Sequence, residues 1–155
     1  MPYKTRELSK MKIKEELKSL FKTYQEISKQ VKSSKGVEIR MDGRMHFKPI
    51  NIQYSDLDEN VKKEYDRISS KLEKCNFSCG YGQWNDIIGD LVFRIYYEET
   101  NTEFVISKPV IYEGDSLEGV FKLEVWKDNN LEKVDFYHED RLIEVLSNQN
   151  KKKDD

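Results

Sequence analysis

The chain has 155 residues, a formal net charge of −2 and 37% hydrophobic residues. This length suits one domain with its own core, and 7 Phe, 9 Tyr and 2 Trp residues are too many for a disordered chain. No apolar run reaches the roughly 18 residues of a membrane-spanning helix, and two cysteines make no disulfide framework. We therefore expect an intracellular, cytoplasmic protein without a membrane segment.

The near-neutral total hides a charge reversal along the chain. Residues 1–50 carry 13 Lys and Arg against 6 Asp and Glu, whereas residues 91–150 carry 6 against 13. Such an asymmetry indicates a charged partner without naming it. Alanine, normally a common residue, is absent, which suggests an AT-rich gene from a low-GC bacterium, or from a phage or mobile element of one.

Residues 5–33 are expected to form one long basic helix. Its apolar side chains recur at alternating spacings of four and three residues, the a/d rhythm of a heptad. The stripe consists of Ile13, Leu17, Leu20, Tyr24, Ile27 and Val31. It suits packing against the chain's own sheet, and the alternative is a homodimer through this N-terminal helix.

A hairpin and a second helix are expected next. Apolar and polar side chains alternate on both sides of Asp42-Gly43, which predicts a hairpin over residues 37–54. Ser55 and Asp58 are placed as a capping box for a helix over residues 56–75. The apolar face of that helix is formed by Leu57, Val61, Tyr65, Ile68, Leu72 and Cys75.

Residues 76–90 show no regular pattern and are interpreted as a shaped loop that presents Tyr81 and Trp84. Exposed aromatic side chains of this kind often anchor protein interfaces. A β-meander is expected over residues 91–146, ending in a short strand or helix.

Two hairpins of the meander have a predicted register. In the first, Ile95 faces Ile106 around a turn at Thr100-Asn101. In the second, Leu123 faces Phe136, which places His138 on the apolar inner face of the sheet.

The element order predicts an α+β fold: a long N-terminal amphipathic helix, a β-hairpin, a second helix and a four- or five-stranded antiparallel meander. The helices pack on one face of a curved sheet. Residues 1–150 form a single domain and 151–155 a disordered tail. This order resembles that of the cone-shaped NTF2-like and cystatin-like domains. The resemblance implies a concave inner face, in which His138 would line a pocket.

Nothing in the sequence is typical of a catalytic, metal or cofactor site. Cys75 and Cys79 have a tolerable zinc-ligand spacing, but His46 and His138 are remote from them. Gly80-Tyr81-Gly82 follows a predicted helix rather than a strand, so the context of a phosphate loop is missing. We expect no catalytic residues, no metal and no cofactor, and a binding protein rather than an enzyme.

Three functional hypotheses remain. The first is a non-enzymatic interaction protein, such as a small inhibitor, immunity or adaptor protein, that binds a protein partner through a charge-polarised surface. Its binding residues are Tyr81, Trp84, Glu98, Glu99 and Glu103. The second is non-specific nucleic-acid binding through a lysine row on the first helix. That row consists of Lys14, Lys18, Lys22, Lys29 and Lys32. The third is a small-molecule pocket or enzyme of the NTF2-like kind, with His138 in the pocket.

Overall fold

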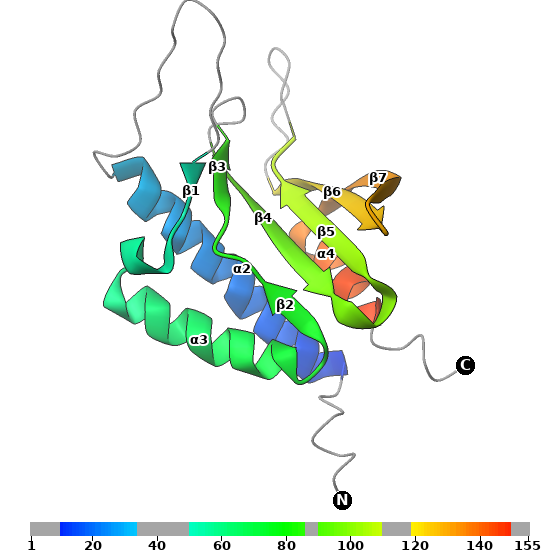
Figure 1. The fold of residues 1–155 in the computed structure, drawn as a ribbon, viewed down its shortest axis with the longest axis horizontal. Helices are drawn as coiled ribbons and strands as arrows, with labels where there is room; N and C mark the ends of the chain where they lie inside the picture. Colours follow the sequence, from blue (N-terminus) through cyan, green and yellow to red (C-terminus); the bar gives the residue numbers. More distant parts are fainter. Residues whose placement is uncertain (1–9, 34–49, 86–89, 110–118, 150–155) are drawn as a thin grey trace, which may run out of the picture.

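The computed structural model describes residues 10–33, 50–85, 90–109 and 119–149. Within these ranges, three α-helices pack on one side of an antiparallel sheet (Figure 1). The strands follow the order β1-β3-β4-β5-β6-β7, and β2 pairs with the second half of β4. The predicted α+β class, with helices on one face of a curved sheet, is confirmed.

Helix α2 covers Lys10–Ser33, so the described part of the first predicted helix is confirmed. Every residue of its apolar stripe, from Ile13 to Val31, is buried. The stripe packs against the sheet and the neighbouring helices α3 (Glu59–Glu73) and α4 (Glu139–Ser147). A homodimer through α2 would therefore have to use the remaining, charged face of the helix. Neither α2 nor any other described helix is both long and apolar enough to cross a bilayer.

Helix α3 begins later than the sequence predicted. Tyr54–Asp56 forms a separate 3-10 helix (η1), in which the Gln53 backbone N–H donates to the Asp56 carboxylate at 3.0 Å. Asp58 then takes the N-cap position of α3, so the predicted capping box at Ser55 is wrong. The predicted apolar face is confirmed, because all of its members are buried: Leu57, Val61, Tyr65, Ile68, Leu72 and Cys75.

Two short strands lie in the described part of the predicted irregular loop. β2 (Phe77–Cys79) and β3 (Gln83–Asn85) both pair antiparallel with β4 (Asp90–Tyr97). Each has three residues, which is too short for a period-2 pattern to be recognised. Between them, Gly82 has a φ of 104°, a conformation that favours glycine.

The hairpin expected over residues 37–54 lies outside the described residues except at its end. There, β1 (Ile50–Asn51) pairs antiparallel with β3. Residues 5–9 of the first predicted helix and the tail 151–155 also lie outside the described part of the chain.

The first meander hairpin has a register two residues away from the predicted one. β4 pairs with β5 (Thr102–Ser107), and Ile95 faces Phe104 rather than Ile106. The cause is the connection, in which the 3-10 helix Glu98–Thr100 (η2) is followed by a residue in the left-handed region, Asn101. Because an even shift leaves every side chain on its face, the inner side remains apolar.

The second meander hairpin is shifted by one residue, and this reverses the faces of its last strand. β6 (Val120–Lys127) and β7 (Asn130–His138) are joined by a two-residue turn, Asp128-Asn129, in which both φ angles are positive. A register shift between Val125 and Trp126 then leaves the rest of β7 one residue away from its predicted pairing with β6. Since the side-chain period of a strand is two, a one-residue shift moves the whole apolar set of β7 outward.

The consequences for Phe136 and His138 are direct. Phe136 lies opposite Lys122, not Leu123, and His138 lies opposite Val120. His138 is exposed on the outer face. The predictions that Phe136 faces Leu123 and that His138 lies on the inner face of the sheet are therefore wrong.

The last predicted element is a helix. In α4, which follows β7 directly, Leu142, Ile143 and Leu146 are buried in the common core. Figure 1 shows α4 behind β5, on the same side of the sheet as α2. The opposite side of β4–β7 is not covered by any described element.

Candidate functional site

The face of the sheet turned away from the helices, called the outer face here, carries exposed apolar side chains beside charged ones. Its side chains form rows across the strand ladder. One row consists of Tyr96, Glu103, Trp126 and Leu131. The next row consists of Arg94, Val105, Glu124 and Val134. Apolar side chains therefore gather toward β6 and β7.

Four of these side chains, Trp126, Leu131, Val134 and Phe136, are called the hairpin patch. Leu131, Val134 and Phe136 are 48%, 40% and 57% exposed, and Trp126 is half-buried. Single exposed apolar side chains are ordinary, whereas a contiguous group of large ones is a feature of interaction sites. The other large exposed apolar side chains in the described ranges, Met11 and Tyr54, lie on different elements.

Charged side chains next to the hairpin patch neutralise one another. Lys122 Nζ lies 3.2 Å from Glu124 Oε2, and Arg94 Nε lies 3.7 Å from Glu103 Oε2. Trp126 Nε1 donates to Glu124 Oε1 at 2.9 Å, which holds the indole against the sheet. These two ion pairs therefore add no net charge to the part of the outer face next to the patch.

Acidic side chains border one end of the patch and are called the acidic rim: Glu98, Glu99 and Asp128. Asn76 Nδ2 donates to Glu99 Oε1 at 2.8 Å, and Ser78 Oγ donates to Glu98 Oε1 at 3.3 Å. Asn101 Nδ2 donates to Asp128 Oδ1 at 2.6 Å, which ties the η2 turn to the β6–β7 turn. The Tyr97 hydroxyl also donates to Glu99 Oε2 at 2.8 Å, so each acidic side chain of the rim is held in place by at least one hydrogen bond.

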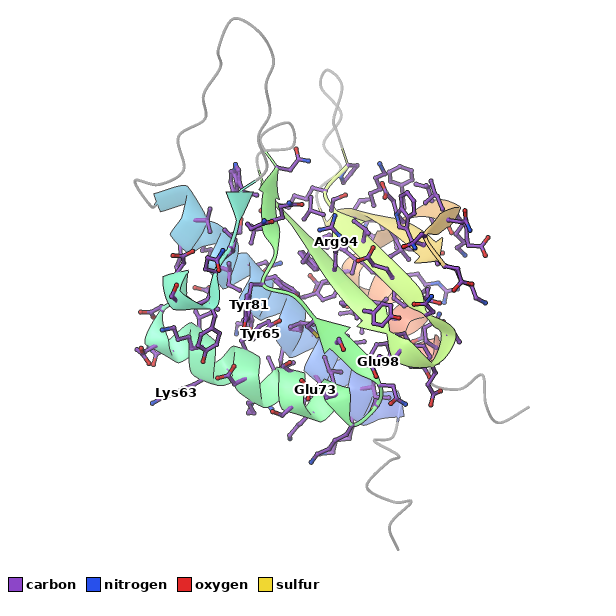
Figure 2. All side chains as sticks on the ribbon, viewed as in Figure 1. Lys63, Tyr65, Glu73, Tyr81, Arg94 and Glu98 are labelled. Carbon is purple, nitrogen blue, oxygen red and sulfur yellow. The ribbon has the colours of Figure 1, made fainter. Side chains whose placement is uncertain are left out.

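The structure does not bring all predicted partner-binding residues together. Trp84 is 2% exposed, so the prediction that a loop presents it at the surface is wrong. The Tyr81 ring packs between Tyr54 and Tyr65, with ring centroids 5.5 and 5.0 Å away. Figure 2 shows Tyr81 beside Tyr65 and well separated from Glu98. Of the predicted set, Glu98, Glu99 and Glu103 remain at one place on the surface.

The predicted lysine row on α2 is interrupted by acidic side chains. Lys14 forms an ion pair with Glu144 of α4. Lys29 Nζ lies 3.5 Å from Glu26 Oε1, within the same helix. Lys18 and Lys22 are exposed, and Glu15 is exposed on the same helix; the side chain of Lys32 is outside the described part. This mixture is a weaker match to a line of phosphates than the sequence suggested.

A cavity of about 250 Å³ lies between α2 and the inner face of the sheet. Its lining includes Phe21, Tyr24, Ser28, Asp90, Phe93, Lys108 and Phe121, and His138 is not part of it. The Asp90 carboxylate accepts hydrogen bonds from the Ser28 hydroxyl and, at 2.8 Å, from the Leu91 N–H. Lys108 Nζ lies 2.7 Å from it. The buried carboxylate of the cavity is thus satisfied by the chain itself.

Burial alone would raise the pKa of the Asp90 carboxyl. The hydrogen bonds from Lys108, Ser28 and the Leu91 backbone outweigh that effect, and its pKa lies below the ordinary value. Asp90 is therefore a carboxylate that joins α2 to β4, rather than a general acid.

The Cys79 thiol is weakly reactive. Burial, with a smaller contribution from Glu73, raises the pKa of the Cys79 thiol to about 12. A thiol with such a pKa is a poor nucleophile near neutral pH. Within the described ranges, no three His, Cys, Asp or Glu side chains gather in a way that could hold a metal ion.

Comparison with known proteins gives no relative: no family model, curated protein or solved structure matches this chain. The function therefore has to be argued from the surface itself. The hairpin patch was not predicted from the sequence, although one signal was present. Asp128-Asn129 are residues that tolerate positive φ, as a two-residue hairpin turn requires, and this turn fixes the register that exposes Phe136.

Proposed function

We propose that this chain is a non-enzymatic interaction protein that binds a protein partner through the hairpin patch and the adjacent acidic rim. The exposure of Leu131, Val134 and Phe136 on one face of one hairpin carries the proposal. Burying these side chains in a complex recovers about 25 cal/mol for each Å² of apolar surface removed from water.

The two parts of the surface have different tasks. The hairpin patch supplies a desolvated apolar centre, which governs how slowly the complex dissociates. The acidic rim supplies long-range attraction, which governs how fast the complex forms and how strongly salt slows it. The partner surface that fits this arrangement is an apolar patch with basic side chains along one edge.

This arrangement suits a small inhibitor, immunity or adaptor protein. Such a protein acts by occupying a surface of its partner and needs no catalytic group of its own. The ion pairs Lys122–Glu124 and Arg94–Glu103 support the same interpretation, because burying paired charges beside the hairpin patch costs less than burying the same charges unpaired.

Affinity purification from the cell that encodes this chain tests the proposal. The tagged wild type is compared with Leu131→Ser, which removes an exposed side chain of the patch, and with Met11→Ser as the matched control. Met11 is 71% exposed, but it belongs to α2 on the other side of the sheet. We expect a protein that the wild type and Met11→Ser retain equally and that Leu131→Ser loses.

With the purified partner, the rates separate the two parts of the surface. Leu131→Ser should mainly raise the dissociation rate, whereas Glu98→Lys with Glu99→Lys should mainly lower the association rate at low salt. A partner that Leu131→Ser retains as well as the wild type does would refute the proposed surface.

A further inference from the structure

Strand β7 is an open edge. It is the last strand in the sheet order, and in the described ranges it pairs only with β6. None of its nine residues is buried. The unpaired backbone N–H and C=O groups of such an edge can accept another strand.

The first part of β7 carries features that discourage pairing. Lys133 pairs with Val125 and Leu131 pairs with Trp126, which leaves Glu132 as an extra residue, a bulge. Bulges and lysines on edge strands both oppose the addition of a strand. From Val134 to His138, however, the register with β6 is regular and the segment contains no proline.

A second copy of this chain could pair with this segment about a two-fold axis perpendicular to the sheet. Such an axis leaves the outer faces of both copies on the same side of the joined sheet. One residue of β7 must therefore lie opposite the same residue of the second copy, and the axis passes between these two. An axis at Asp135 sets two carboxylates opposite each other, which is unfavourable. An axis at Val134 brings the bulged Glu132 opposite Phe136. An axis at Phe136 avoids both problems.

With the axis at Phe136, every opposed pair falls within the regular segment. Phe136 faces its own copy, and Val134 faces His138 of the second copy, which places apolar and aromatic groups together on the outer face. Asp135 faces Tyr137 of the second copy. The Tyr137 hydroxyl donates to Asp135 of its own strand at 3.1 Å, beside Lys133 Nζ at 3.0 Å, so this donor and acceptor are complementary and can also pair across the axis.

We propose that β7 of this chain pairs antiparallel with β7 of a second copy about an axis at Phe136, joining two sheets into one. The two hairpin patches then lie side by side on one continuous outer face. This dimer goes beyond the proposed partner binding and does not depend on it, because it forms from the pure protein.

Disulfide trapping in the pure protein tests the pairing. Phe136→Cys places two thiols across the axis, within the Cα separation of about 7 Å that a disulfide tolerates. Leu131→Cys is the matched control, since it lies on the same face of the same strand but five residues from the axis. We expect mild oxidation to give a covalent dimer of Phe136→Cys at least tenfold faster than of Leu131→Cys.

Light scattering gives an independent measurement. The wild type should approach twice its 18.5 kDa mass as its concentration rises, and Phe136→Lys should remain monomeric because it opposes two ammonium groups. A wild type that stays monomeric at every concentration overturns the proposal. So does a dimer in which the thiol at position 131 cross-links as fast as the one at position 136.

Discussion

Lys122 and Phe136 are direct partners in the β6–β7 ladder, and this pairing turns the Phe136 ring away from the core. The neighbouring pair on the opposite face, Phe121 and Tyr137, packs against the core, where the Phe121 ring lies 5.6 Å from Phe21 of α2. Two phenylalanines on adjacent strands of the same hairpin therefore have opposite environments, and they differ in what they contribute to stability and to binding.

The first prediction concerns these two rings. Phe136→Ser should change the free energy of unfolding by no more than about 0.5 kcal/mol, because the ring is exposed. Phe121→Ala should cost about 3–5 kcal/mol, because it removes core contacts and enlarges the cavity between α2 and the sheet. Urea denaturation of dilute protein measures both. A Phe136→Ser cost comparable to that of Phe121→Ala would contradict the β7 register.

The second prediction concerns the contact between α2 and α3. The Glu16 carboxylate is buried and forms ion pairs with two side chains of α3. Its Oε1 lies 3.1 Å from Arg67 Nη1, and its Oε2 lies 3.4 Å from Lys71 Nζ. Replacing both cations by methionine should cost about 3–5 kcal/mol, since a buried carboxylate is left unpaired. Glu16→Gln should cost less, because Arg67 and Lys71 are partly exposed and water can solvate them. The order of the two urea midpoints is the measurement, and equal losses would contradict this interpretation.

The third prediction is a pH dependence at Asp90. Its folded-state pKa lies below the ordinary value of 3.8, so the ionised carboxylate stabilises the fold fully above that pH. The contribution is lost as the pH falls below 3.8 toward the folded-state pKa. Asp90→Asn should therefore be less stable than the wild type at pH 7, and the difference should shrink at pH 3. Denaturation midpoints of the two proteins across this range provide the check, and a constant difference would count against the assignment.

Much of the fold could be predicted because the helices have long periodic stripes. Every predicted apolar position of α2 between Ile13 and Val31, and of the helix after Leu57, is buried. The faces predicted for the side chains of β4 and β5 were also correct, because the error in the register between these strands was an even number of residues. Strands of three residues, such as Phe77–Cys79, carry too little periodicity to be recognised.

The candidate site was harder to predict, because hydrophobic alternation alone places Val134 and Phe136 in the core. The Asp128-Asn129 turn and the register shift at Val125 decide otherwise. The error at Trp84 was the reverse, because a side chain expected at the surface is buried. Trp84 pairs with Leu91 of β4, and no local pattern in the sequence reveals that partner.

The fourth prediction concerns nucleic acid and the lysines of α2. Because Lys14 and Lys29 are paired with Glu144 and Glu26, we expect no saturable binding of labelled DNA or RNA at about 100 mM salt. Fluorescence anisotropy measures this directly. Tight binding that falls steeply with salt, and that Lys18→Glu with Lys22→Glu abolishes, would make the lysine row the functional surface instead.

Site-specific photo-cross-linking in the cell that encodes this chain can detect a partner bound at the hairpin patch. A photoreactive residue is placed at Leu131, in the hairpin patch and away from the proposed dimer axis, or at Lys63, which is exposed on α3 and projects away from the sheet (Figure 2). The proposed function predicts a discrete adduct with one partner protein from position 131 and none from position 63. An adduct from position 63 alone, or the absence of one from position 131, would contradict it.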